Sequence, residues 1–382
     1  MQYHLMATMA AGLEALTARE LQDLGYQTRT ENGKVYFDGD DTAIATANVW
    51  LRTADRIKII VGQFKATTFD ELFEAVRALP WDDYLPLDAA FPVAGRSVRS
   101  TLHSEPDVQA ITKKAIVDKL AGVYHRRGRL PETGATYPLE VSILKDVATL
   151  TIDTTGPSLF KRGYRIAKGE APLKENFAAA LVMLTNWRPD LPFYDPTTGS
   201  GTIAIEAALI GHHLAPGLNR AFAFEQFGFM QPVLPAVKDA ALDAADFDAE
   251  LDILGADINQ EMIDIANVNA KQAGLLHSVR FKQLAVKDWR PSSDYGVIVA
   301  NPPYGKRLGE LDAARKLYRE MGQVYRPLTG WSKYILTADL GFEKAYGAPA
   351  TKRRKLYNGT LRTDYFQYWA TQHPHHQHGG NQ

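Results

Sequence analysis

The chain has 382 residues, which allows two or three domains with sizeable cores. It contains no cysteine, and this excludes both a disulfide framework and a thiolate metal site. With a formal net charge of -1, the chain as a whole does not attract nucleic acid, so such a function must rest on local basic clusters.

The N-terminus, "MQYHLMATMAAG", has no basic segment, and polar residues and a glycine interrupt its apolar residues. Such a segment does not resemble a signal peptide. No apolar run elsewhere in the chain is long enough to span a membrane. The sequence therefore predicts a cytoplasmic protein that does not associate with membranes.

The first 156 residues predict short strands and helices. "HLMATMA" has the pattern of a strand, an amphipathic helix follows and ends at Gly25, and Asn32 with Gly33 forms the turn of a hairpin. The same criteria predict helices at residues 41–54, 68–81 and 105–128, strands at 57–66 and 91–101, and a hairpin at 137–156. This part is expected to be an α+β region without a solenoid repeat.

The composition changes at residues 156–173, which are rich in Gly, Pro and Lys and predict a linker before a helix that starts near Lys174. Strands then alternate with helices, a pattern typical of a parallel, doubly wound sheet. A hairpin at Asn358-Gly359 breaks this pattern near the end. Residues 215–250 are expected to be an insertion without chemistry, and the His-rich tail a disordered segment, so no metal site is predicted.

The segment "DPTTGSGT", residues 195–202, connects a predicted strand to a predicted helix. Gly199 and Gly201 allow a ligand to approach the backbone, and Asp195 places a carboxylate at the strand end. The spacing is neither GxGxxG nor a P-loop. A carboxylate here would repel a pyrophosphate and would pair with a cationic or amino-bearing ligand, although an ordinary turn has the same composition.

Two further acids follow the next two strands. Asp257, in "GADIN", suits a bidentate hydrogen bond to a ribose diol, although such a residue is often a helix N-cap, a role for which Asn259 competes. Asp288, in "AVKDW", can accept a hydrogen bond from an adenine amino group or can simply begin a turn. The hypothesis that these acids bind a ligand is strengthened because they fall on successive strand ends.

The fourth strand ends in Asn301, Pro302, Pro303 and Tyr304. The two prolines lack N–H donors and hold Asn301 in an extended conformation. The side-chain carbonyl of Asn301 and the backbone carbonyl of Pro302 can accept the hydrogens of an exocyclic amine and direct its lone pair at an electrophile. Tyr304 offers a face on which the base can stack.

These motifs resemble the class I S-adenosylmethionine-dependent methyltransferases that modify exocyclic amines, and the resemblance covers residues 160–370. It implies a Rossmann-like seven-stranded sheet with a terminal antiparallel hairpin. It also implies that the residues at 301–304 are catalytic. The residues that would bind the cofactor are Asp195, Thr197, Gly199, Gly201, Thr202, Asp257, Ile258 and Asp288.

The segments "ATMAAGLEALTARELQDLG" and "KRGYRIAKGEAPLKENFAAAL" resemble THUMP-bearing RNA methyltransferases, in particular the first half of the bacterial large-subunit ribosomal RNA guanine-N2 methyltransferases. The resemblance implies a ferredoxin-like segment at 1–65, a THUMP RNA-binding domain at 66–160 and a class I methyltransferase domain at 161–382. It also places Lys174 and Asn176 beside the cofactor. The fused enzymes carry a second methyltransferase module further on, and a second activity is not expected here.

The expected function is methyl transfer from S-adenosylmethionine to guanine N2 in 23S rRNA or a ribosome assembly intermediate, with no obligate protein partner. The alternatives are an adenine-N6 methyltransferase on DNA or RNA, a guanine-N2 methyltransferase on tRNA, a nucleotide-dependent oxidoreductase and a purely RNA-binding protein. A basic stretch at 96–129 is expected to follow RNA phosphates, although its helical part could be an ordinary solvated face. The predicted RNA contacts are Arg96, Arg99, Lys113, Lys114, Arg126, Arg127, Lys306 and Arg307.

Overall fold

The computed structural model describes residues 1–166, 173–305 and 310–372, which divide into two compact units. Unit 1 comprises Met1–Met9, Thr17–Leu159 and Gly217–Ala241, and unit 2 comprises the described parts of residues 10–16, 160–216 and 242–372. The chain passes from one unit to the other at residues 9–10, 16–17, 159–160, 216–217 and 241–242. No described helix is long and apolar enough to cross a membrane.

The described strands of unit 1 form a seven-stranded sheet in the order β2-β3-β1-β4-β7-β6-β5. The strand β4 pairs with β1 on one side and with β7 on the other, and a bulge lies between its residues Ile60 and Gly62. All pairings are antiparallel except that of β5 with β6. The strands are β1 (Tyr3–Thr8), β2 (Arg29–Glu31), β3 (Lys34–Gly39), β4 (Arg56–Lys65), β5 (Val93–Val98), β6 (Leu139–Leu144) and β7 (Val147–Asp153).

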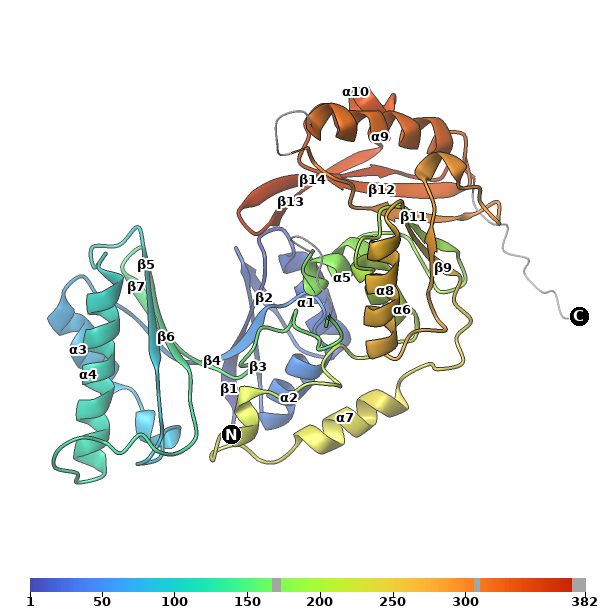
Figure 1. Cartoon of the computed structure of the whole chain (residues 1–382). Coiled ribbons are helices and arrows are strands. Elements are labelled where there is room, and N and C mark those ends of the chain that lie inside the picture. Colours follow the sequence, from blue (N-terminus) through green and yellow to red (C-terminus); the bar gives the residue numbers. More distant parts are fainter. Residues whose placement is uncertain (167–172, 306–309, 373–382) are drawn as a thin grey trace, which may run out of the picture. The chain divides into compact units, whose positions relative to one another are not determined.

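The two faces of this sheet differ because successive side chains of a strand point to opposite sides. Leu5, Ile57 and Ile59 are buried in the core, whereas their neighbours on the other face include His4 and Lys58. Figure 1 shows α3 and α4 beside β5, β6 and β7. The helices before residue 160 are α1 (Glu14–Asp23), α2 (Asp41–Trp50), α3 (Phe69–Ala78), η1 (Trp81–Asp83) and α4 (Glu105–Val123), of which α4 ends five residues earlier than predicted.

The predicted insertion contributes to the core of unit 1. It contains η2 (Ala223–Gln226) and begins α7 (Leu234–Asp243). The ring of Phe227 stacks on Tyr137 with 4.7 Å between centroids, and the N–H of Gly228 donates to the Tyr137 hydroxyl at 3.1 Å. Residues 217–241 therefore complete a core that residues 17–159 do not close by themselves.

Unit 2 has a second described sheet of seven strands, in the order β10-β9-β8-β11-β12-β14-β13. The first five strands in this order are parallel, and β14 and β13 are antiparallel to their neighbours. This arrangement confirms the predicted class I methyltransferase topology with its terminal hairpin. The strands are β8 (Phe193–Asp195), β9 (Ile253–Asp257), β10 (Arg280–Gln283), β11 (Gly296–Ala300), β12 (Trp331–Thr337), β13 (Lys352–Asn358) and β14 (Leu361–Tyr368).

Side chains cover both faces of the central strands of unit 2, and every residue of β11 and β12 is buried. On one face the Tyr365 hydroxyl donates to the carbonyl of Leu181 in α5, and on the other Phe366 packs on Phe342 of α10. Figure 1 shows α5 and α10 on opposite sides of this sheet. A ligand can therefore reach the strands only at their ends. The helices are α5 (Glu175–Met183), α6 (Thr202–Gly211), α8 (Gln260–Gln272), η3 (Val286–Asp288), α9 (Glu310–Tyr325) and α10 (Phe342–Tyr346).

Candidate active site

The predicted site residues come together at the carboxyl ends of three adjacent parallel strands. Asp195 ends β8, Asp257 ends β9, and Asn301 follows β11. Because β8 lies between β9 and β11, the order of the strands reverses at β8. The crevice at such a point is where doubly wound sheets bind ligands.

A cavity of about 740 Å³ opens at this edge of the sheet. Its wall contains most residues of the segment 195–202, here called the glycine turn, together with Asp257 and all four residues of the Asn-Pro-Pro-Tyr loop at 301–304. The side of α9 that faces it completes the wall. The lining residues are Leu173, Pro196, Thr197, Thr198, Gly199, Ser200, Thr202, Ile203, Asp257, Ile258, Met262, Ala285, Val286, Asn301, Pro302, Pro303, Tyr304, Glu310, Ala313, Ala314, Lys316, Leu317, Glu320 and Asn358.

The glycine turn needs its two glycines for different reasons. Gly199 and Gly201 have φ of 51° and 83°, values that favour glycine. A Cβ on Gly199 would meet no atom within 4 Å, whereas one on Gly201 would lie 2.9 Å from Ala266 and Phe281. Gly199 therefore leaves open space beside the turn, and Gly201, which is outside the cavity wall, allows close packing behind it.

Asp195 is fully buried and has an incomplete set of partners. The N–H of Thr197 donates to its Oδ1 at 3.4 Å, but within the described residues its Oδ2 and the Thr197 hydroxyl have no hydrogen-bond partner. Burial raises the pKa of Asp195 to about 7, against the smaller opposing effect of the nearby Thr198 hydroxyl and Thr197 N–H. Asp195 is not itself part of the cavity wall, but the next three residues are.

Asp257 and Ile258 lie in the wall as expected. The two carboxylate oxygens of Asp257 accept the N–H groups of Gly199 at 3.1 Å and Asn259 at 2.9 Å, which ties β9 to the glycine turn. Asn259 is the N-cap of α8, since its side chain accepts the N–H of Glu261 at 2.9 Å. The ribose role of Asp257 remains a prediction, and the competing role of N-cap belongs to Asn259.

The structure does not place Asp288 in the cavity wall. This residue is exposed at the end of η3, whereas Ala285 and Val286 line the cavity. The chain turns through η3 before it reaches the acid, so the acid faces solvent. The role of Asp288 at adenine was predicted from its position after the strand and gains no support from this geometry.

The Asn-Pro-Pro-Tyr loop is braced by hydroxyl groups. The Tyr304 hydroxyl donates to Oδ1 of Asn301 at 2.5 Å, and the Tyr318 hydroxyl donates to the carbonyl of Pro303 at 2.8 Å. Tyr318 also lies 3.0 Å from the hydroxyl of Thr337 on β12. Burial raises the pKa of Tyr304, so its hydroxyl stays protonated and keeps the carbonyl of Asn301 in place.

Lys174 and Asn176 lie near the site but not in its wall. Lys174 is exposed, and its ammonium lies 4.7 Å from the centre of the Phe160 ring. Asn176 is buried in the first turn of α5. Leu173 is the residue of this segment that lines the cavity, so the segment contributes through a residue that the sequence did not single out.

The predicted linker contains a buried ionic network. Arg165 donates to the Thr202 hydroxyl at 2.9 Å and to the carbonyl of Leu173 at 2.7 Å, and it pairs with Glu175 at 3.0 Å. Thr202 and Leu173 both line the cavity, so Arg165 holds together two parts of its wall.

Of the predicted linker, residues 160–166 and 173 are therefore part of unit 2, whereas residues 156–159 belong to unit 1. The arginine spacing in "KRGYR" is a weak signal of this role.

The contributions of α9 and the terminal hairpin to the cavity were not predicted from the sequence. Glu310, Ala313, Leu317 and Glu320 recur at helical spacing and face the cavity, and Asn358 reaches it from the β13–β14 turn. The amphipathic spacing is visible in the sequence, but it does not tell which face meets the site.

Within the described residues, no group of His, Asp or Glu side chains could hold a metal ion.

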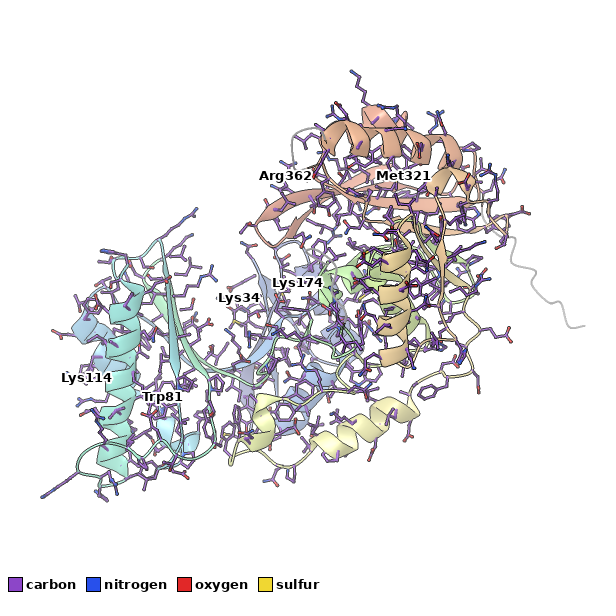
Figure 2. All side chains as sticks on the ribbon, in the orientation of Figure 1. Lys34, Trp81, Lys114, Lys174, Met321 and Arg362 are labelled. Atoms are coloured by element: carbon purple, nitrogen blue, oxygen red, sulfur yellow. The ribbon has the colours of Figure 1, made fainter. Side chains whose placement is uncertain are left out.

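The predicted RNA contacts do not form one surface. Arg96 and Arg99 are exposed at and just after β5, and Arg126 and Arg127 are exposed just after α4. Figure 2 shows Lys114 on the far side of the β5–β7 strands from Lys34, whereas Arg96 is close enough to Lys34 for its charge to lower the pKa of that lysine. These roles remain predictions, and Lys306, Arg307 and the His-rich tail lie outside the described residues.

Lys113 makes contacts within unit 1, and an RNA phosphate would have to compete with them. Its ammonium pairs with Glu132 at 2.8 Å, donates to the carbonyl of Phe91 at 2.9 Å and lies 3.5 Å from the centre of the Phe91 ring. These contacts hold the loop after α4 on the helix. Lys113 is therefore engaged within unit 1, and its contact with an RNA phosphate stays a prediction.

Residues 162–367 match the sequence family described as RMKL-like, methyltransferase domain. The chain belongs to this methyltransferase family. Residues 4–58 match the RlmL ferredoxin-like domain, and residues 66–153 match the THUMP domain. These matches confirm the predicted resemblance.

Proteins similar over nearly the whole chain include "Putative RNA methyltransferase YpsC" of Bacillus subtilis (strain 168), 52% identical over 98% of this chain and 97% of that protein. "Ribosomal RNA large subunit methyltransferase K/L" of Magnetococcus marinus is 32% identical over 97% of this chain but 54% of that longer protein. The crystal structure of "SMU.472, a putative methyltransferase complexed with SAH" is 51% identical, has a TM-score of 0.93, and matches over 97% of this chain and 99% of that chain.

Proposed function

We propose that this chain transfers a methyl group from S-adenosylmethionine to the exocyclic N2 amine of a guanine in 23S rRNA. The observation that carries the proposal is the loop at residues 301–304, which lines the same cavity as the glycine turn and Asp257. A rigid pair of carbonyl acceptors beside a cofactor-sized cavity suits transfer to an amine. The methyltransferase family supports the class of reaction.

The residues of the cavity fit S-adenosylmethionine, whose demethylated form is present in a solved relative. The buried Oδ2 of Asp195 and hydroxyl of Thr197 offer polar partners for the amino-acid part of the cofactor. Asp257 retains lone pairs for ribose hydroxyls, since each carboxylate oxygen can accept more than one hydrogen bond. Ile258 and Val286 give the adenine an apolar surface.

When bound, S-adenosylmethionine supplies a methyl group on a positively charged sulfur. Oδ1 of Asn301 and the carbonyl of Pro302 accept the two hydrogens of the substrate amine and direct its lone pair. The Tyr304 hydroxyl occupies one lone pair of Oδ1 and leaves the second for the amine. The methylated amine loses its surplus proton to water, so no side chain has to act as a general base.

The RNA target is supported by the ferredoxin-like and THUMP matches in the first half of the chain and by the name of the K/L relative. The loop alone would equally serve adenine N6, because it recognises an amine and not a base. We favour guanine N2 because the sequence resembles the first half of the bacterial large-subunit ribosomal RNA guanine-N2 methyltransferases. The name of the K/L relative supports rRNA as the target but does not identify the base.

Mass spectrometry of nucleosides from separated 23S rRNA and tRNA tests the proposal. We compare a deletion strain with strains that express the wild-type chain or Asn301→Ala. The expected result is that N2-methylguanosine is lost from 23S rRNA in the deletion strain and returns only with the wild-type chain. Loss of N6-methyladenosine would assign the adenine reaction, loss from tRNA alone would change the target, and unchanged nucleosides would overturn the proposal.

A further inference from the structure

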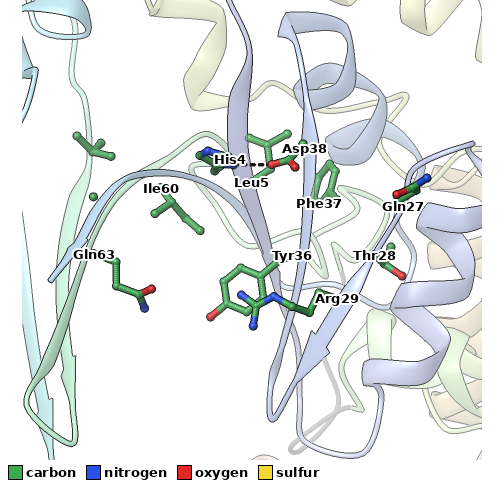
Figure 3. A pocket seen from close by; sticks show the side chains of 12 residues that line it. His4, Leu5, Gln27, Thr28, Arg29, Tyr36, Phe37, Asp38, Ile60 and Gln63 are labelled. Carbon is green, nitrogen blue, oxygen red and sulfur yellow. Dashed lines mark hydrogen bonds and ion pairs between the residues drawn. The ribbon is translucent and has the colours of Figure 1, made fainter. Parts of the chain in front are cut away.

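A second cavity lies within unit 1, on the face of its sheet that the core does not use. It has a volume of about 530 Å³. Figure 3 shows Tyr36 and Arg29 projecting from the β2–β3 hairpin and Gln63 from β4 toward the same opening. The strands β1 and β4 form its floor, with His4 and Ile60 in the lining.

The side of this groove formed by β2 and β3 carries a flat stack of two side chains. The guanidinium carbon of Arg29 lies 4.3 Å from the centre of the Tyr36 ring. Glu31 accepts from both Arg29 and the Tyr36 hydroxyl, the latter at 3.1 Å. These bonds fix the ring and the guanidinium plane relative to each other, although Arg29 and Glu31 are largely exposed.

Basic side chains from distant strands border the same face. Lys34 on β3 and Arg96 on β5 form no ion pair with a described residue, whereas Lys58 on β4 pairs with Glu140 at 2.8 Å. Burial lowers the pKa of Lys34, the acids Glu31 and Glu140 oppose this effect, and the positive charges of Lys58 and Arg96 act in the same direction as burial. A bound anion would relieve this unfavourable burial of charge.

We propose that this groove binds single-stranded RNA, with one base stacked on the Tyr36–Arg29 pair and the adjoining phosphates against Lys34 and Arg96. This inference rests on the proposed RNA substrate and adds the place where an unpaired part of that RNA binds. Sheet surfaces bind single-stranded RNA by stacking bases on aromatic rings and guanidinium planes. The groove has room for a nucleotide rather than a duplex, whose bases are already stacked on each other.

The opposite face of the same unit provides a matched comparison. Phe73 on α3 lies 5.8 Å from Arg77 and 5.8 Å from Lys114, so it is also an aromatic ring with basic neighbours. These residues lie on helices, and none of them lines the groove between the β2–β3 hairpin and β4. If RNA bound any aromatic ring with basic neighbours, whatever the shape of the surface, it would bind at Phe73 as well as at Tyr36.

Binding of a fluorescent oligoadenylate of about twelve nucleotides to the full chain tests the proposal. Tyr36→Ala should weaken binding about tenfold, because one stacked base contributes ~1–3 kcal/mol. Tyr36→Phe should bind nearly as the wild type does, and Phe73→Ala should have no effect. Lys34→Met should reduce the slope of log affinity against log salt concentration by an amount that corresponds to about one phosphate contact. Tyr36→Ala should leave this slope unchanged.

Photo-cross-linking of the wild-type chain to 5-iodouridine RNA provides a measurement that needs no variant, and the cross-link is expected at Tyr36. Equal binding by the wild type and Tyr36→Ala, equal loss in Phe73→Ala, or a cross-link confined to the helical face would overturn the inference. A matching duplex that binds as tightly and depends equally on Tyr36 would also overturn it.

The same experiments separate the two proposals. If the wild-type chain methylates rRNA while Tyr36 has no effect, only the groove is wrong. If the wild-type chain binds and methylates no RNA, the proposed function fails as well.

Discussion

The two sheets of this chain each have seven described strands but place their polar residues differently. In unit 2 the strands β11 and β12 are buried along their whole length, and polar groups gather at the strand ends. In unit 1 one face is apolar and the other carries charged residues along several strands. A sheet covered on both sides restricts chemistry to one edge, whereas a half-open sheet offers an extended surface.

This difference separates two kinds of function within one chain. The edge of the unit 2 sheet fixes a few atoms within hydrogen-bonding distance of one another, as transfer of a methyl group requires. In the proposal above, the open face of unit 1 contacts RNA through several residues that are largely exposed to solvent, and each such contact is expected to be weak. Substitutions should therefore have large, localised effects at the edge of unit 2 and moderate, distributed effects in unit 1.

The sharpest test of the comparison is Asn301→Ala. Loss of an oriented acceptor should lower the rate of methyl transfer about 100- to 1000-fold while the affinity for S-adenosylmethionine stays near that of the wild type. Single-turnover kinetics and calorimetry give the two quantities. Transfer at the wild-type rate would remove the catalytic role of Asn301 and would place the chemistry elsewhere.

The next largest effect is expected for Asp257→Ala. The substitution removes an acceptor that also holds the N–H of Gly199, so the affinity for S-adenosylmethionine should fall about 10- to 100-fold. Asp288→Ala is the matched control, since this acid also follows a strand but is exposed and outside the cavity wall. A comparable loss in Asp288→Ala would restore the role in adenine binding that the sequence predicted.

In unit 1, reversing the charge of Arg126 and Arg127 together should weaken RNA binding about tenfold at low salt and flatten its salt dependence. Cofactor affinity should not change, and reversal of Lys271 and Lys282, both exposed in unit 2, serves as the control. Equal losses of RNA affinity in both double variants would show that RNA binding depends only on the total charge of the chain.

The smallest effect is a pH dependence from Asp195. Its pKa is about 7 in the fold, against an ordinary value near 3.8, so its stabilising contribution is complete below pH 3.8 and is lost as pH rises through 7. The cofactor-free chain should therefore unfold at a lower temperature at pH 8 than at pH 6.

Binding of the cofactor should show the opposite trend. The carboxylate form pairs with a positive charge, so the affinity for S-adenosylmethionine should rise about tenfold over the same interval. Thermal unfolding and calorimetry measure the two trends, and Asp195→Asn should lack both.

The placement of the Asn-Pro-Pro-Tyr loop and Asp257 at the cavity was predictable because its signals are local. An apolar strand followed by Asn301 and two prolines fixes both the position and the stiffness of the loop without information from elsewhere. Asp257 was predictable for the same reason. Asp288 shows the limit of this argument, since a single turn of η3 after the strand was enough to place Ala285 and Val286 in the wall instead.

Contacts between distant segments were not predictable. Glu310 and Glu320 line the cavity only because α9 packs at that edge of the sheet, and nothing in their spacing states which face is used. The composition at 156–173 predicted a linker, yet Arg165 is held by Glu175 and Thr202. Gly, Pro and Lys favour flexible chain only where no partner is available, and here the partners come later in the sequence.

The return of residues 217–241 to unit 1 has a consequence for synthesis of the protein. A ribosome that has made residues 1–160 has not yet made Phe227, which stacks on Tyr137. The core of unit 1 can close only after more than half of the chain has left the ribosome. Its apolar surface therefore stays available to chaperones or to aggregation during elongation, and unit 1 should gain resistance to protease late in translation.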